Sequence, residues 1–127
     1  MDAYQTHGAF SWSELLTTDP ERAADFYGKL FGWTFDSMDM GTGPYRVIKA
    51  AGTSIGGIMA VPPDSPGMTP AWGPYVTVKD VDATVKDCVA LGGKVMVPPM
   101  DIPSVGRMAV VQDPQGACIN VITYSGG

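Results

Sequence analysis

Apolar and polar residues alternate along residues 10–17, which predicts a strand with one face formed by Phe10, Trp12, Glu14 and Leu16. A helix is predicted to follow, because Asp19 is a typical N-cap and Pro20 suits the first helical position. Apolar residues then recur at helical spacing as far as Gly32, which predicts the end of the helix. Three further segments, which are separated by glycine turns, are predicted to be strands, at residues 33–40, 45–51 and 54–61.

The same pattern begins again in the second half of the chain, where Asp80 repeats the N-cap of Asp19. For this second copy the pattern predicts a helix at residues 81–91 and strands at 73–78, 94–97, 107–111 and 118–124. The shift from Asp19 to Asp80 also pairs Leu30 with Leu91, Gly32 with Gly93, Arg46 with Arg107 and Met59 with Asn120. A unit this small needs its copy to bury its apolar face, so we expect the two to pack around a shared cleft.

The repeat also predicts the domain organisation. We expect a first βαβββ module at residues 1–61, a linker at residues 62–71 and a second βαβββ module at residues 72–127, all within one compact domain. The linker prediction depends on four prolines between residues 62 and 70, which suit neither a helix nor a central strand.

Composition narrows the class of protein. Of the 127 residues, 45% are hydrophobic and 17% are charged, as in globular domains, and no apolar run approaches the roughly 20 residues of a membrane span. A net charge of −5 argues against nucleic-acid binding, which needs a basic surface. Residues 1–8 lack the pattern of a secretory signal, and Cys88 and Cys118 resemble reduced core cysteines, so we expect a cytoplasmic protein.

Short motifs follow one another in a fixed order along both copies. In the first copy they lie at residues 14–19, 23–27, 30–33 and 56–59, and in the second copy at residues 75–83, 91–93, 106–107 and 113–116. In this order they resemble the vicinal oxygen chelate superfamily, which includes glyoxalase I, extradiol dioxygenases, fosfomycin resistance enzymes and bleomycin-binding proteins. The resemblance covers nearly the whole chain. It implies an α+β fold of two tandem βαβββ modules, with a mixed sheet that curls into a cleft and helices outside.

The resemblance also implies where a metal would be bound. Metal-using members hold it with a His or similar group on the first strand of each module and a Glu on the last strand. The matching positions in this sequence are Trp12, Gly73, Met59 and Asn120. None is a good ligand for a hard divalent ion, so we expect neither a metal nor another cofactor. His7, the one histidine of the sequence, precedes the first strand and would need a different alignment to act as a ligand.

The residues expected to contact a small-molecule ligand are Trp12, Glu14, Met59, Trp72, Tyr75, Arg107 and Asn120. Glu14 is the candidate catalytic residue, because a carboxyl group among apolar neighbours would have a raised pKa and could act as a general acid or base. The alternative is that Glu14 forms a hydrogen bond to backbone or an ion pair with Arg46 or Arg107.

Each of the other candidates has a structural alternative as well. Trp12 could stack on a flat ligand or fill the core of its module, and Tyr75 could donate a hydrogen bond to a ligand or pack in the core. Arg107 could bind a carboxylate or enolate oxygen, or form a structural salt bridge. Asn120 can both donate and accept, which suits it to orient a polar group of the ligand.

Three functions are compatible with these features. The first is a glyoxalase-like or bleomycin-resistance-like protein that binds a small apolar or aromatic molecule in the cleft without metal. The second is a metal-dependent lyase, isomerase or dioxygenase that recruits its metal through His7 and Glu14. The third is an interaction module with no ligand. The resemblance also implies pairing into a homodimer, with the cleft built within one chain or between two.

Overall fold

The computed structural model describes residues 1–39, 44–61 and 69–125, and the chain divides into two compact units. The first unit is formed by Trp12–Gly73, and the second unit by Met1–Ser11 together with Pro74–Gly127. The N-terminal segment that precedes Trp12 therefore belongs with the second half of the chain. Most of the predicted linker, residues 62–68, lies outside the described residues, as does residue 40 at the end of the strand predicted at 33–40.

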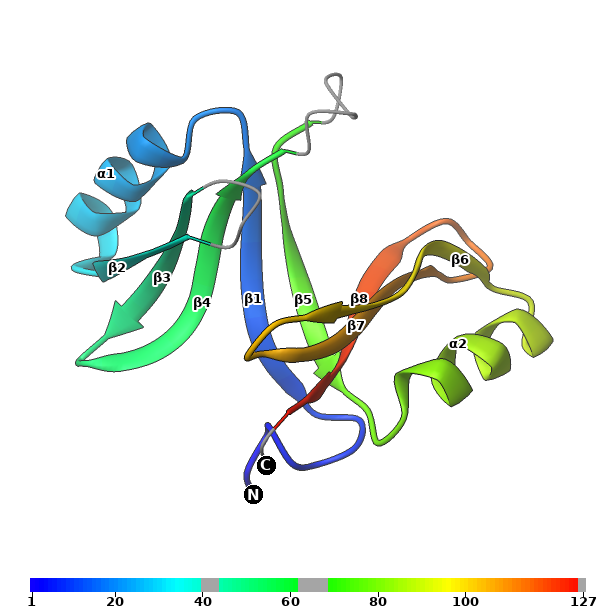
Figure 1. Ribbon diagram of the computed structural model, residues 1–127. Coiled ribbons are helices and arrows are strands. Elements are labelled where there is room, and N and C mark those ends of the chain that lie inside the picture. The colour runs from blue at the N-terminus through cyan, green and yellow to red at the C-terminus, as the bar shows by residue number, and fades with distance from the viewer. Residues whose placement is uncertain (40–43, 62–68, 126–127) are drawn as a thin grey trace. The chain divides into compact units, whose positions relative to one another are not determined.

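In the first unit, the described residues form a helix and a mixed sheet (Figure 1). Its elements are β1 (Phe10–Thr17), α1 (Pro20–Phe31), β2 (Thr34–Asp39), β3 (Pro44–Ala50) and β4 (Thr53–Ala60). β1 pairs in parallel with β4, and β3 pairs antiparallel with both β2 and β4, so the strand order is β2-β3-β4-β1. The first two residues of β1 belong to the second unit.

α1 begins and ends where the sequence predicts. The side chain of Asp19 accepts a hydrogen bond from the backbone N–H of Arg22 at 3.1 Å, and Pro20 opens the helix. Gly32 ends it with a φ of 75°, a left-handed conformation that glycine adopts without strain. The helix covers one face of the sheet through a core cluster of Leu15, Ala24, Ile48 and Ile58.

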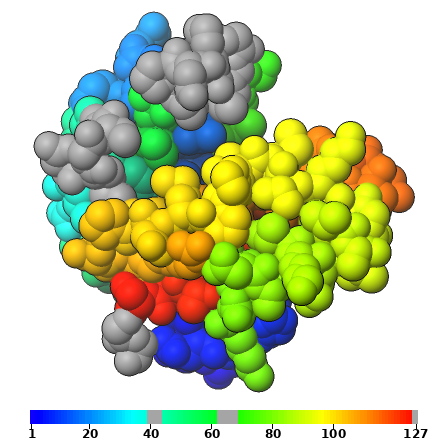
Figure 2. All heavy atoms as spheres, turned by 45° about the vertical axis from the view of Figure 1, so that its right-hand side comes forward, coloured from blue at the N-terminus to red at the C-terminus, as the bar shows by residue number. Residues whose placement is uncertain are grey.

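The second unit repeats this plan. Its elements are β5 (Ala71–Thr77), α2 (Val81–Ala90), β6 (Lys94–Ile102), β7 (Gly106–Gln112) and β8 (Cys118–Tyr124), in the strand order β5-β8-β7-β6. The first three residues of β5 belong to the first unit. The side chain of Asp80 caps α2 by accepting from the N–H of Ala83 at 3.1 Å. The helix packs on the sheet through Val78, Val81, Ala109, Val111 and Val121. Figure 2 shows α2 and β6, yellow-green to yellow, at the surface of this unit.

β6 is longer than the strand predicted at residues 94–97, because it continues through Pro98 and Pro99 to Ile102. Proline has no N–H to donate, and a strand that contains it is tolerated at the outer position of a sheet or at a bulge. β6 meets both conditions, since it is last in the strand order of its unit and its register against β7 shifts twice. The strand predicted at residues 94–97 is therefore too short.

The spacing of the repeat changes along the chain. On the first strand of each module, Leu16 corresponds to Thr77, and these two residues have the same separation as Asp19 and Asp80. Their partners on the last strands are Met59 and Ile122, so Met59 corresponds to Ile122 and the predicted pairing of Met59 with Asn120 is wrong by two positions. Because a shift of two keeps a side chain on the same face of a strand, the predicted faces are unaffected.

The prediction of an α+β fold built from two βαβββ modules is confirmed. In each unit a helix lies on one face of a mixed sheet. Neither α1 nor α2, the helices of the described residues, has the length and apolar character of a membrane span.

Candidate functional site

Side chains from three strands of the first unit share the face of its sheet opposite α1. Strand alternation places Glu14 and Leu16 on this face, because Leu15 between them packs under α1. Leu16 pairs with Met59, and Met59 pairs with Tyr45 of β3, so these side chains lie on the same face. We name the surface formed by Trp12, Glu14, Tyr45 and Met59 the Glu14 face.

Two hydrogen bonds in series cross the Glu14 face. Trp12 Nε1–H donates to Tyr45 Oη at 3.0 Å, and the Tyr45 hydroxyl donates to Glu14 Oε2 at 2.8 Å. The indole nitrogen can only donate and an ionised carboxylate can only accept, so the tyrosine proton is directed at Glu14. A hydrogen bond to a charged acceptor is stronger than one between neutral groups, and this one fixes the position of the carboxylate.

Gly57 makes room for this arrangement. It pairs with Glu14 on β1 and with Val47 on β3, and a Cβ atom built on it would overlap the ring and hydroxyl of Tyr45. A side chain at residue 57 would therefore exclude Tyr45 from its present position. A glycine inside a strand often marks such a close approach.

The three hydrogen-bonded side chains differ in burial. Tyr45 is 7% exposed, whereas Trp12 and Glu14 are both partly exposed. A buried hydroxyl that has both a donor and an acceptor as partners avoids the cost of losing its hydration. The result is a carboxylate and an aromatic ring that are held in place from within and are each accessible to a small molecule.

Tyr45 is the functional candidate that the sequence analysis missed. It lies 31 residues from Glu14, and the two are brought together only by the pairing of β3 with β4 and of β4 with β1. The sequence did carry one signal, the pair Gly56 and Gly57 inside a predicted strand, which indicated a close approach of another group.

Trp72, another predicted ligand contact, lies on the α1 side of the first unit. Its Nε1–H donates to Tyr27 Oη at 3.2 Å, and its ring meets the rings of Tyr27 and Trp33 at centroid distances of 5.4 and 6.1 Å. The structure therefore places Trp72 with α1, and not with Glu14.

In the second unit, Tyr75 and Asn120 are direct partners in the β5–β8 ladder. Both face away from α2, because their neighbours Val76 and Val121 pack against it. Tyr75 is 6% exposed, and Asn120 Nδ2 donates to the carbonyl of Pro74 at 3.2 Å. The two residues are therefore neighbours on the face opposite α2, and the predicted cleft between the modules stays a prediction.

Arg107 lies on the α2 side of its sheet, where it forms ion pairs with Asp82 at 2.7 Å and with Asp101 at 3.0 Å. The hydrogen bonds that Arg107 donates to Asp82 and Asp101 raise the pKa of Arg107, and the bond that Asp82 accepts lowers the pKa of its carboxyl. Arg46 forms the equivalent pair with Glu21 on α1. Each arginine stands 25 residues after its acid, so the repeat itself carried this signal.

The structure also alters the ionisation of Tyr124. Burial raises its pKa, while a hydrogen bond with Ser11, at 2.7 Å between the hydroxyl oxygens, acts in the opposite direction. Its ring also meets that of Tyr4 edge to face, at a centroid distance of 4.9 Å. Residues near the N-terminus are thereby attached to β8.

The residues at the four metal-ligand positions of the superfamily do not fit a hard divalent ion. Trp12 offers only an N–H donor, which Tyr45 accepts, and Gly73 has no side chain. Met59 offers a soft thioether, and Asn120 offers a single neutral amide oxygen. His7 Nδ1 accepts from the backbone N–H of Lys79 at 3.0 Å. Within residues 1–39, 44–61 and 69–125 no group of three or more His, Cys, Asp or Glu side chains is placed to hold a metal ion.

Comparison with curated proteins gives relatives along most of the chain. The protein named "Putative glyoxylase CFP32" from Mycobacterium tuberculosis is 46% identical over 116 residues, which cover 91% of this chain and 44% of that protein. Anthracycline biosynthesis protein DnrV from Streptomyces peucetius is 35% identical over 127 residues, covering 90% of this chain and 46% of that protein. The chain thus spans less than half the length of these relatives.

Solved structures share the fold at low sequence identity. Methylmalonyl-CoA epimerase from Mycobacterium tuberculosis matches with a TM-score of 0.66 and 15% identity, over 91% of this chain and 86% of that one. A methylmalonyl-CoA epimerase in complex with methylmalonyl-CoA and NH4+ matches with a TM-score of 0.67 and 13% identity, over 95% and 97% of the two chains.

The sequence also matches a described family over most of its length. Residues 9–121 match the Glyoxalase/Bleomycin resistance protein/Dioxygenase superfamily, as the motifs and the βαβββ modules indicated. The chain belongs to this superfamily.

Proposed function

We propose that this chain binds a small, flat, largely apolar or aromatic molecule on the Glu14 face, without a metal. The observation that supports the proposal is the series of hydrogen bonds from Trp12 through Tyr45 to Glu14. It holds an aromatic surface and a carboxylate at fixed positions on one face of a sheet. Few but well-placed polar groups beside aromatic side chains are typical of small-molecule sites.

The chemistry of the Glu14 face defines the ligand class further. The ring of Trp12 offers a surface on which a flat molecule can stack. The Glu14 carboxylate, already accepting from Tyr45, recognises a hydroxyl or N–H donor on the ligand. We therefore propose a fused-ring aromatic with at least one hydrogen-bond donor at its edge. If a bound ligand loses a proton, Glu14 is the residue proposed to accept it.

The names of the relatives agree with this class of ligand. Two of them are anthracycline biosynthesis proteins, and anthracyclines are flat fused-ring molecules with hydroxyl groups. Other relatives carry the name glyoxylase, so an enzymatic role for this chain is compatible with the same proposal. Tyr75 and Asn120 stay predicted ligand contacts, and a homodimer and a cytoplasmic location stay predictions.

The test compares two ligands of similar size, 2-naphthol and 2-methoxynaphthalene, of which only the first has a hydroxyl proton. We expect Glu14→Gln to weaken 2-naphthol binding at least tenfold, the effect of losing about 1.5 kcal/mol from a hydrogen bond to a charged group. Binding of 2-methoxynaphthalene should change little. Glu21→Gln, the same substitution on α1, is the control. Equal binding of both ligands by the parent protein and by Glu14→Gln would overturn the proposal.

The metal-free part of the proposal has its own test. Protein purified without chelator would be analysed for iron, manganese, zinc and nickel, and its thermal unfolding would be followed with each ion added. Stoichiometric metal, or a metal that raises the unfolding temperature only when the Glu14 side chain is present, would favour the metal-dependent enzyme. We expect neither, because of the donors at the four ligand positions.

A further inference from the structure

The first unit has a hollow on its α1 side that the proposed function does not use. Its volume is about 470 Å³, and it is lined by Ser13, Tyr27, Phe31, Trp33, Ile48, Ile55, Gly56 and Trp72. Ile48 packs in the core beneath α1, whereas Tyr45 of the same strand lies on the Glu14 face. The hollow and the Glu14 face therefore lie on opposite sides of the sheet. We name this hollow the Tyr27 pocket.

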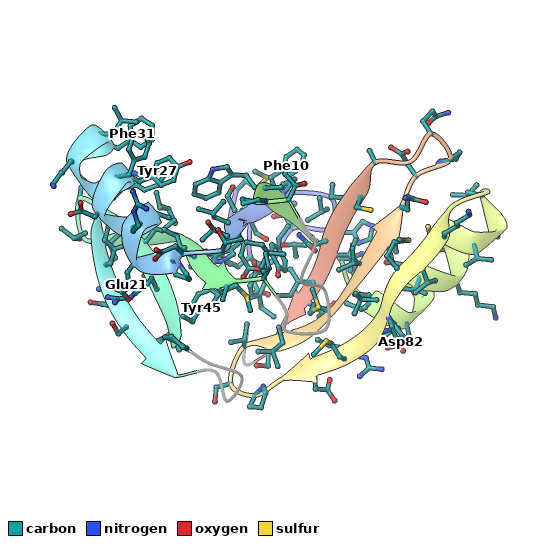
Figure 3. The ribbon with its side chains drawn as sticks, turned by 90° about the horizontal axis from the view of Figure 1, so that it is seen from above. Phe10, Glu21, Tyr27, Phe31, Tyr45 and Asp82 are labelled. Atoms are coloured by element: carbon teal, nitrogen blue, oxygen red, sulfur yellow. The ribbon has the colours of Figure 1, made fainter. Side chains whose placement is uncertain are left out.

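Four aromatic rings form one wall of the Tyr27 pocket. The rings of Tyr27 and Phe31 are stacked with an interplanar angle of 13° and a centroid distance of 6.0 Å, and Figure 3 shows these two residues next to each other along α1. The ring centroids of Trp33 and Phe31 are 5.0 Å apart, and the ring of Trp72 meets that of Tyr27 edge to face at a centroid distance of 5.4 Å. Such a wall offers both ring faces and ring edges to a further aromatic group.

Two of these rings are more exposed than aromatic residues usually are. Phe31 is 57% exposed and Trp72 is 40% exposed, and Ile55, which also lines the pocket, is 39% exposed. A contiguous exposed apolar patch of this kind is typical of a binding surface. No lining residue carries a charge, so the pocket favours a neutral ligand.

The hydroxyl of Tyr27 is a polar group that can orient a ligand in the pocket. Tyr27 Oη accepts from Trp72 Nε1–H at 3.2 Å, which leaves its own proton to be donated. Within residues 1–39, 44–61 and 69–125 that proton has no hydrogen-bond acceptor. A donor that is itself an acceptor from an indole N–H is polarised, and its next hydrogen bond is strengthened. The pocket therefore offers a placed donor beside an aromatic wall.

We propose that the Tyr27 pocket is a second ligand site, specific for a neutral, flat, fused-ring aromatic that carries a hydrogen-bond acceptor such as a ring carbonyl. The ligand packs against the wall formed by Phe31, Trp33 and Trp72 and accepts the proton of Tyr27. The volume lies within the range of small-molecule sites. The selectivity is opposite to that of the Glu14 face, where a carboxylate recognises a donor, and the inference stands independently of the proposed function.

The tryptophans make a direct test feasible, because the sequence has three. Trp33 and Trp72 line the Tyr27 pocket, whereas Trp12 lies on the Glu14 face. Protein labelled with 5-fluorotryptophan would be titrated with coumarin and followed by fluorine NMR, with the signals assigned from single Trp→Phe variants. We expect saturable shifts of the Trp33 and Trp72 signals and an unchanged Trp12 signal.

A matched pair of ligands tests the role of the hydroxyl. Naphthalene has the ring size of coumarin but no acceptor, so Tyr27→Phe should weaken coumarin binding about fivefold to tenfold and leave naphthalene binding unchanged. Tyr4→Phe removes a tyrosine hydroxyl from the second unit, where the Tyr4 ring meets Tyr124, and as the control it should change neither. The proposal is overturned if coumarin shifts only Trp12, if no saturable shift occurs, or if Tyr27→Phe weakens both ligands equally.

Discussion

Gly57→Ala should be among the most damaging small substitutions in the described part of the chain, because residue 57 lies under the ring of Tyr45. The added Cβ would overlap the Tyr45 hydroxyl and lie 2.5 Å from its Cε1, so the ring has to leave. Its departure breaks the hydrogen bonds to Trp12 and Glu14. Losing one neutral and one charged hydrogen bond and exposing part of the ring should lower the free energy of unfolding by about 2–4 kcal/mol.

A double-mutant cycle separates this overlap from an intrinsic effect of alanine. Tyr45→Ala removes the overlapping ring, and Gly57 does not have a positive φ, so Gly57→Ala in that background should cost less than about 0.5 kcal/mol. Urea unfolding followed by far-ultraviolet circular dichroism gives all four free energies. Should Gly57→Ala fail to fold, the double variant should restore folding. Equal costs of Gly57→Ala in both backgrounds would refute the placement of Tyr45.

Three further predictions concern other parts of the molecule. Because Arg107 lowers the pKa of Asp82, their ion pair should stabilise the fold above the ordinary carboxyl pKa of about 4 and lose this effect as pH falls. In a plot of unfolding free energy against pH, Asp82→Asn should therefore flatten the acid side, and an unchanged plot would contradict the prediction. Burial raises the pKa of Tyr124, so stability should fall above about pH 10 and fall less in Tyr124→Phe, as alkaline thermal unfolding would record. Asp19→Ala removes an N-cap and should lower the free energy of unfolding by about 1 kcal/mol, as measured by urea unfolding. An unchanged free energy would contradict the role of Asp19 as the N-cap.

Helix boundaries were readable from the sequence because the interactions that set them are local. Asp19 and Asp80 each bond to a backbone N–H three residues later, and Gly32 supplies its own left-handed turn. The repeat then fixed the order of the remaining elements. These features need no knowledge of which strands pair, and the two βαβββ modules followed from them.

Strand register could not be read in the same way. Along β6, Val95 and Val97 oppose the neighbouring residues Val111 and Val110, so one extra residue is accommodated there, and a second shift follows before Met100. β2 and β3 pair without interruption. Bulges depend on pairing with a partner strand, and a repeat read at one constant shift cannot show them. The prediction that equated Met59 with Asn120 failed for this reason.

The candidate site was predictable on one strand and not across strands. Alternation along β1 placed Trp12 and Glu14 on one face, and the structure agrees. The hydrogen bond between Glu14 and Tyr45 depends on the pairing of three strands. Trp72 was expected among the ligand contacts because it is close to the junction of the two modules in the sequence, but its contacts with Tyr27 place it beside α1.

The two modules can be compared position by position once the register is known, and the comparison separates the two sides of each sheet. On the helix side two aliphatic core positions are kept, since Ile48 corresponds to Val111 and Ile58 to Val121, and all four are buried in the two cores.

On the other side the chemistry changes, since Tyr45 corresponds to Met108 and Gly57 to Asn120. A core demands apolar side chains of suitable volume in both modules. Packing does not require a buried hydroxyl over a glycine in one module when the corresponding positions of the other hold a thioether and an amide. The arrangement of Tyr45 over Gly57 therefore has no counterpart in the repeat that packing would explain, and this difference is what favours the Glu14 face as the place where the first unit acts.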